Sequence, residues 1–174
     1  MELNMIKPVK QLDKKMGHVS QSNHTHFPEI VDQIFKWTPL ASILLLNATG
    51  AKTKNDFQGH LLLTTTAEAL MNSVLEPLKS NVDRIRPNHS PNPNSFPSKH
   101  TATAFLGAEI LRHELKNTNP ILGYSGFAIA AATGALRIYN NKHWLSDVIV
   151  GAILGIASAK ATYWILKKMK FGVH

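Results

Sequence analysis

Two histidines and four cationic side chains stand in three short clusters between Lys79 and Asp147. Imidazoles can serve as nucleophiles and proton donors, and fixed cations bind oxyanions. The combination predicts a site that processes a phosphoryl group. The clusters read Lys79-x6-Arg86-Pro87, Pro97-Ser98-Lys99-His100-Thr101 and Arg137-x5-His143-x3-Asp147.

His143 and Asp147 are four residues apart at the start of an apolar, helix-like run. This spacing places both side chains on one helix face, about one turn apart. A carboxylate that accepts from one ring nitrogen fixes the tautomer and leaves the other nitrogen free to attack. The pair therefore predicts a nucleophile and its orienting group. The alternative is a helix-capping pair without chemistry.

His100 follows Ser98, which is a good N-cap because its hydroxyl can accept from unpaired N–H groups of the first turn. A helix N-terminus also binds anions, so Ser98 and the Lys99 amide are candidate phosphate ligands. If the His100 imidazole is protonated near neutral pH, it can donate to a leaving oxygen as a general acid. The alternative is an exposed first-turn histidine.

Lys79, Arg86 and Arg137 are the other candidate phosphate ligands. Arg84 stands between Lys79 and Arg86, and like charges at this density repel one another unless an anion neutralises them. A guanidinium can hold two phosphate oxygens at once. Taken singly, cations of this kind are far more often solvated surface residues.

Apolar residues recur at helical spacing in five segments, and nothing resembles a strand. We expect an all-α, compact bundle of five to six helices, with the active site at one end. The proline-rich segment 86–100 is expected to be a loop. A polar N-terminal arm over 1–33, possibly an interfacial helix, is expected to precede a single phosphatase domain over 34–170. The expected helices span 34–50, 57–78, 100–115, 121–136 and 146–168.

The composition leaves both membrane and soluble classes open, with 44% hydrophobic residues, 17% charged residues and a formal charge of +8. The positive charge favours anionic partners. If both loops that carry the site, 79–99 and 137–146, lie on one side of a membrane, many lysines fall on the other side. This distribution fits the positive-inside rule and favours a membrane location. These lysines are Lys52, Lys54, Lys116, Lys167, Lys168 and Lys170.

The three clusters resemble the motifs of the type 2 phosphatidic acid phosphatase and haloperoxidase superfamily, K-x6-R-P, P-S-G-H and S-R-x5-H-x3-D. The resemblance covers about residues 35–168. Two positions depart from it: Lys99 replaces a glycine and Leu136 replaces a serine. We interpret both as changes in phosphate binding, because His143, Asp147 and His100 remain.

The resemblance implies a phosphatase that needs no metal or other cofactor and hydrolyses phosphomonoesters through a phosphohistidine. His143 would be the nucleophile and His100 the acid. The expected substrate is a phosphorylated lipid, including pyrophosphates, or a small phosphomonoester, and no nucleic-acid partner is expected. The expected location is the bacterial cell envelope, in the inner membrane with the site facing the periplasm.

Three alternatives stay open at this point. One is a soluble periplasmic acid phosphatase of low specificity, and another is a non-catalytic phosphate or anionic-lipid binder. A haloperoxidase using bound vanadate shares the family's pocket, but its known members are much larger chains. The sequence does not predict the oligomeric state.

Overall fold

The computed structural model describes residues 11, 13, 15, 27–88 and 94–171. Within them lie five helices and no strand, which confirms the all-α prediction. Most of the predicted N-terminal arm, including any interfacial helix in it, lies outside the described residues. The helices are α2 (Glu29–Ala48), α3 (Phe57–Asn81), α4 (Lys99–Leu115), α5 (Pro120–Tyr139) and α6 (Leu145–Lys168).

The helices begin close to the predicted positions because local capping signals set them. Asp56 caps α3, since its carboxylate accepts from the Gly59 N–H at 2.8 Å. Asn119 caps α5 in the same way, and Pro120 occupies the first helical position, where its missing N–H costs nothing. The largest difference is in α2, which begins at Glu29, five residues before the prediction.

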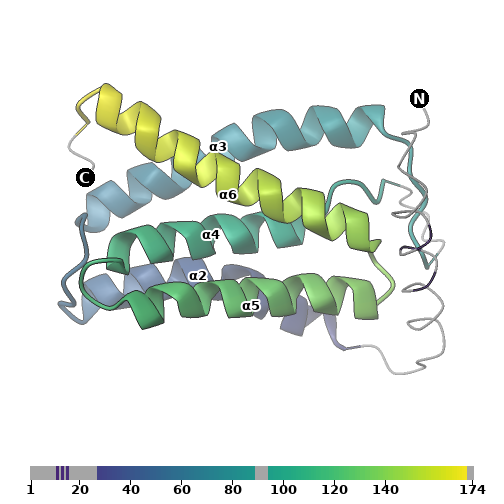
Figure 1. The fold of residues 1–174 in the computed structure, drawn as a ribbon, viewed down its shortest axis with the longest axis horizontal. Coiled ribbons are helices and arrows are strands. Elements are labelled where there is room, and N and C mark those ends of the chain that lie inside the picture. Colours follow the sequence, from purple (N-terminus) through teal and green to yellow (C-terminus); the bar gives the residue numbers. More distant parts are fainter. Residues whose placement is uncertain (1–10, 12, 14, 16–26, 89–93, 172–174) are drawn as a thin grey trace.

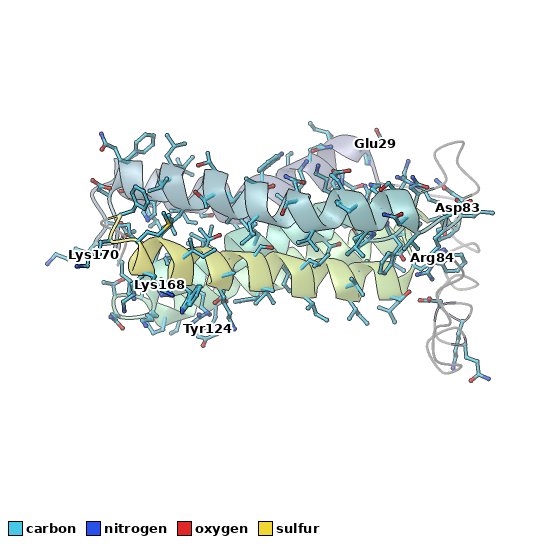
Figure 2. The ribbon with its side chains drawn as sticks, turned by 90° about the horizontal axis from the view of Figure 1, so that it is seen from above. Glu29, Asp83, Arg84, Tyr124, Lys168 and Lys170 are labelled. Atoms are coloured by element: carbon cyan, nitrogen blue, oxygen red, sulfur yellow. The ribbon has the colours of Figure 1, made fainter. Side chains whose placement is uncertain are left out.

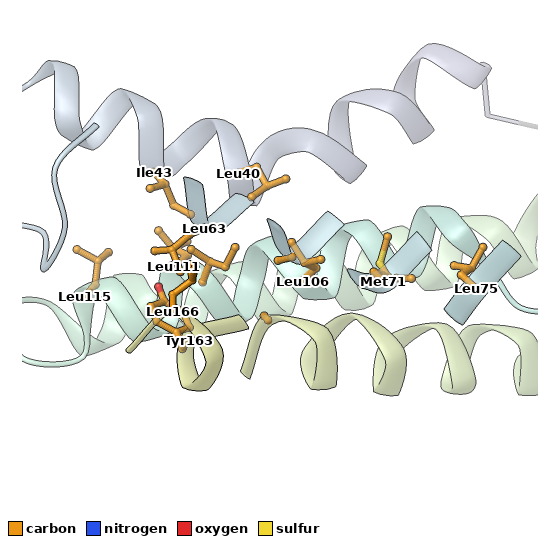
Figure 3. Close-up of a cluster of buried hydrophobic side chains, with 14 residues drawn as sticks. Leu40, Ile43, Leu63, Met71, Leu75, Leu106, Leu111, Leu115, Tyr163 and Leu166 are labelled. Carbon is orange, nitrogen blue, oxygen red and sulfur yellow. The ribbon is translucent and has the colours of Figure 1, made fainter. Parts of the chain in front are cut away.

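Helix α4 runs through the middle of the bundle, with α3 and α6 on one side and α2 and α5 on the other (Figure 1). Its small and apolar side chains are buried on nearly every side, as a central helix requires. Leucines and isoleucines from α2, α3 and α4 meet the end of α6 in one continuous core (Figure 3).

Helix α6 approaches α4 very closely because glycines face it. A Cβ atom built at Gly151 would lie 2.5 Å from the carbonyl oxygen of Ser98, and one at Gly155 would overlap that of Ala102. Only glycine permits this approach. The start of α6 is therefore held directly against the start of α4.

The ends that carry the three clusters lie together. Helices α3 and α5 finish at the end of the bundle where α4 and α6 begin (Figure 1). Figure 2 shows Arg84 at this end and Lys168 and Lys170 at the opposite one. The fold therefore places the site loops at one end and the C-terminal lysines at the other.

Candidate active site

A tight turn returns the chain from Arg137 to His143. The N–H groups of Lys142 and His143 both donate to the carbonyl oxygen of Arg137, at 3.0 and 3.3 Å. Asn141 adopts a positive φ of 54°, a conformation that asparagine tolerates better than most residues. This turn brings the third cluster's arginine and histidine, six positions apart, to the same end of the bundle.

A backbone carbonyl orients the buried imidazole of His143. Nδ1 lies 2.7 Å from the carbonyl oxygen of Ser95 and 3.7 Å from Oδ2 of Asp147. Because a carbonyl oxygen can only accept, Nδ1 carries the proton and Nε2 keeps its lone pair. The sequence predicted that Asp147 would hold the ring directly. In the structure the closest partner of Nδ1 is Ser95, and the carboxylate lies farther away.

The carboxylate of Asp147 is fully buried and accepts several hydrogen bonds. Oδ1 accepts from Nη1 of Arg84 at 2.6 Å. Oδ2 accepts from the Trp144 N–H at 2.8 Å and from the Ser95 hydroxyl. Arg84 in turn donates to the buried carboxylate of Asp13 at 2.7 Å. Asp147 therefore caps the first turn of α6 and also places a negative charge close to His143.

Ser98 is the N-cap of α4, at the predicted position, and His100 lies in the first turn. The Ser98 hydroxyl contacts the Thr101 hydroxyl at 2.9 Å and makes no capping bond to the backbone, which differs from the prediction. The Ser98 N–H donates to the Asp147 carbonyl oxygen at 3.1 Å, which joins the second cluster to the third. Nε2 of His100 lies 3.2 Å from the Gln33 amide nitrogen, so the ring nitrogen accepts and the ring is neutral.

The cations differ in how they are neutralised. Arg137 is buried and donates from Nη1 to Asp32 at 2.6 Å. Among the described residues, neither Lys79 nor Arg86 has a carboxylate within 4.0 Å. The Nε atoms of Arg86 and Arg137 are buried and have no hydrogen-bond partner there. Unpaired buried donors on cations favour binding of an oxyanion.

The ionisable groups of the three clusters act on one another. Burial lowers the pKa of His143, and the charges of Arg137 and Arg86 lower it further. Burial, followed by the charge of Arg137, lowers the pKa of His100 to about 3. Burial and then the charge of Arg86 lower the pKa of Lys79. The structure therefore brings these five residues together in one electropositive site.

The two positions that depart from the family motifs lie differently. The side chain of Lys99 forms a half-exposed ion pair with Glu76 at 2.8 Å, so its charge is partly neutralised at the surface. Leu136 lines an apolar groove between α2 and α5.

Four residues that support the predicted set, three by direct contact and Asp13 through Arg84, did not stand out in the sequence. Asp32 lies before the predicted start of its helix, and nothing in the sequence links it to the clusters. Ser95 acts partly through its backbone, which has no sequence signature. Arg84 drew notice only as an excess charge, and Asp13 lies in the expected arm.

The geometry supports phosphoryl transfer. A neutral imidazole with one nitrogen fixed as the donor can attack phosphorus through the other. Partly unpaired cations can stabilise the charge that develops on the phosphoryl oxygens. No group of three histidine and acidic side chains that could hold a metal ion occurs in the described part of the chain; the expectation of a metal-free site stays a prediction.

Two curated proteins are similar to this chain in sequence. The chain is 35% identical over 136 residues to a lipid A 1-phosphatase of Porphyromonas gingivalis, an alignment that covers 78% of this chain and 30% of that protein. It is 37% identical over 79 residues to the bacitracin transport permease protein BcrC of Bacillus licheniformis, covering 45% of this chain and 36% of that protein. The chain thus spans about a third of the length of the curated relatives it matches.

Two crystal structures share the fold. LpxE of Aquifex aeolicus superposes with a TM-score of 0.63 at 21% identity, covering 93% of this chain and 98% of that one. A transmembrane PAP2-type phosphatidylglycerolphosphate phosphatase of Bacillus subtilis gives a TM-score of 0.68 at 20% identity, covering 94% and 89%. The sequence model of the PAP2 superfamily matches residues 58–170, which contain all three clusters. The chain therefore belongs to the PAP2 superfamily.

Proposed function

We propose that this protein is a metal-independent phosphatase that hydrolyses lipid phosphates through a phosphohistidine. The observation that carries the proposal is the pairing of an oriented, neutral His143 with cations that lack full counter-charges. Arg86 has no carboxylate partner among the described residues, and its Nε is a buried donor without an acceptor. A phosphate oxygen is the acceptor that this donor lacks.

The reaction takes two steps. In the first, Nε2 of His143 attacks phosphorus, the bond to the leaving oxygen breaks, and His100 gives that oxygen a proton. In the second, a water molecule attacks the phosphohistidine, His100 takes up its proton, and inorganic phosphate leaves. Because His100 is neutral in the free site, the bound phosphate dianion must first raise its pKa. Lys79, Arg86 and Arg137 stabilise the charge on the phosphoryl oxygens.

A lipid substrate is supported by the surface of the helices and by the relatives. Large apolar side chains are exposed on α2, α3, α5 and α6, and exposed apolar surface can mark contact with a membrane. One relative is named as a phosphatase of lipid A and one structural neighbour as a phosphatase of phosphatidylglycerolphosphate. We therefore favour a lipid phosphate over a small soluble ester.

We also propose that α5 and α6 cross a bilayer. Both are long and apolar enough by length and composition, and only 33% of each apolar window is buried inside the protein, so most of it faces outward. Such a surface suits hydrocarbon. The positive-inside rule supports an orientation with the lysines near Lys168, at the end opposite the site, in the cytoplasm and the site in the periplasm.

Purified protein in detergent tests the activity. We expect wild type to release phosphate from phosphatidic acid with a metal chelator present, and to carry acid-labile phosphate after rapid quenching. His143→Ala should lose both signals, whereas Asp56→Asn, at the far end of the bundle, should keep them. Binding of the lipid phosphate without phosphate release or label would identify a non-catalytic binder, and activity that stays in buffer without detergent would identify the soluble acid phosphatase.

A further inference from the structure

An apolar groove of about 530 Å³ lies between α2 and α5. We call it the α2–α5 groove. One wall is formed by Phe27, which precedes α2, and by the α2 side chains Val31 and Phe35, at four-residue spacing. The other wall is formed by Ala132, Ala135, Leu136 and Tyr139. Ala132 and Ala135 leave the groove open, because a larger side chain at either position would fill it. Among the described residues, the tyrosine is the only polar or charged one that lines this groove.

Residues that line the groove adjoin the proposed phosphate-binding residues. Leu136 lines it, and the next residue is Arg137. At the end of the groove near the C-terminus of α5, Phe27 packs on Tyr139 with ring centroids 5.5 Å apart. The Phe27 N–H donates to the Asn140 side chain at 3.0 Å, and that side chain donates to Asp32 at 3.3 Å.

Asp32 is the residue that holds Arg137. The groove and the phosphate ligand are therefore fixed by the same set of contacts.

We propose that the α2–α5 groove binds an acyl chain of the lipid phosphate whose phosphoryl group lies against Arg137. The proposal rests on the proposed function. An acyl chain matches a nearly unbroken apolar lining of this volume, which is in the range of small-ligand sites.

The departure at Leu136 supports the same occupant. Where the resembling family usually has a serine, this chain has leucine, which removes a hydroxyl from the wall and makes it apolar up to Arg137. A polar headgroup would gain nothing from that change, whereas a hydrocarbon chain gains contact area.

The test compares substrates with and without a long chain. Ala135 is exposed, so the indole of Ala135→Trp can fill the groove without displacing the core. We expect KM for long-chain phosphatidic acid in mixed micelles to rise about 10-fold with little change in kcat, because binding to ground state and transition state is lost equally. The kcat/KM for p-nitrophenyl phosphate should stay within about 2-fold. Ala157→Trp, at an exposed position on α6 outside the groove, is the matched control.

An unchanged KM for the long-chain substrate would mean that the groove holds only bulk lipid, and the proposal would be wrong. Equal losses on both substrates would also overturn it, since they would indicate damage to the site. Leu136→Ser tests the same wall without added bulk and should raise the long-chain KM in the same direction. A wild-type protein that hydrolyses neither substrate would instead refute the proposed function.

Discussion

Replacing Asp147 by asparagine separates two roles that the sequence assigned to one residue. In Asp147→Asn the ring tautomer should survive, because Nδ1 of His143 donates to the Ser95 carbonyl oxygen at 2.7 Å. What is lost is a negative charge 3.7 Å from Nδ1. At an effective dielectric constant of about 20, that attraction for a cationic ring is about 4.5 kcal/mol. The Arg84 guanidinium, 2.6 Å from the other carboxylate oxygen, offsets part of it.

If about 2 kcal/mol remains, kcat should fall about 30-fold. A carboxylate that alone fixed the tautomer would cost about 10⁴-fold on the same substitution. The acid limb of the kcat/KM profile gives a second readout. His143 must be neutral to attack, and Asp147 raises its pKa against the effect of burial. Removing the charge lowers this pKa further, so the acid limb should move to lower pH.

Steady-state phosphate release across a pH series measures both effects. Asp56→Asn is the matched control, since it also removes a helix-capping carboxylate, at the opposite end of the bundle. A loss of 10³-fold or more would show that the carboxylate fixes the tautomer. An unchanged kcat, or an acid limb displaced to higher pH, would refute the electrostatic reasoning.

Three further predictions concern the surrounding residues. Asp13→Asn should lower kcat about 10-fold and leave KM unchanged, because a charge-assisted bond to Arg84 is weakened. The control Lys15→Ala, at an exposed position nearby, should change neither constant. A change in KM alone for Asp13→Asn would contradict the reasoning. Gly155→Ala should destabilise the fold by about 1–3 kcal/mol, because the added methyl group meets a backbone carbonyl oxygen of α4. A thermal unfolding midpoint in detergent as high as that of wild type would disprove the close packing. The imidazole of His100 should titrate near its pKa of about 3 in the free protein and at a higher pH with inorganic phosphate bound. NMR titration of the ring measures both values. The same pKa in both states would exclude contact between the ring and the anion.

The helices and the site clusters were predictable because their signals are local. Prolines interrupt the segment before His100, the apolar spacing marks each helix, and capping residues such as Asn119 mark its start. The predicted α3 ended at residue 78 and the observed helix continues to Asn81, since nothing in the local sequence stops it there. Errors of this size are expected at helix ends.

The site's supporting contacts were not predictable in the same way. Asp32 and Arg137 are 105 positions apart, and Ser95 and His143 are 48 apart. No local pattern encodes such pairs. The charge of Lys99 also looked available to the site, but the antiparallel packing of α3 and α4 places Glu76 beside it.

The sequence by itself determined an all-α chain with its reactive side chains grouped near helix ends, because helix periodicity, capping and residue chemistry are properties of short segments. Only the tertiary structure decided which atom orients His143 and which carboxylates form ion pairs with Arg84 and Arg137. Those choices depend on how closely α6 approaches α4 and on where backbone carbonyls point, and both follow from packing between distant segments.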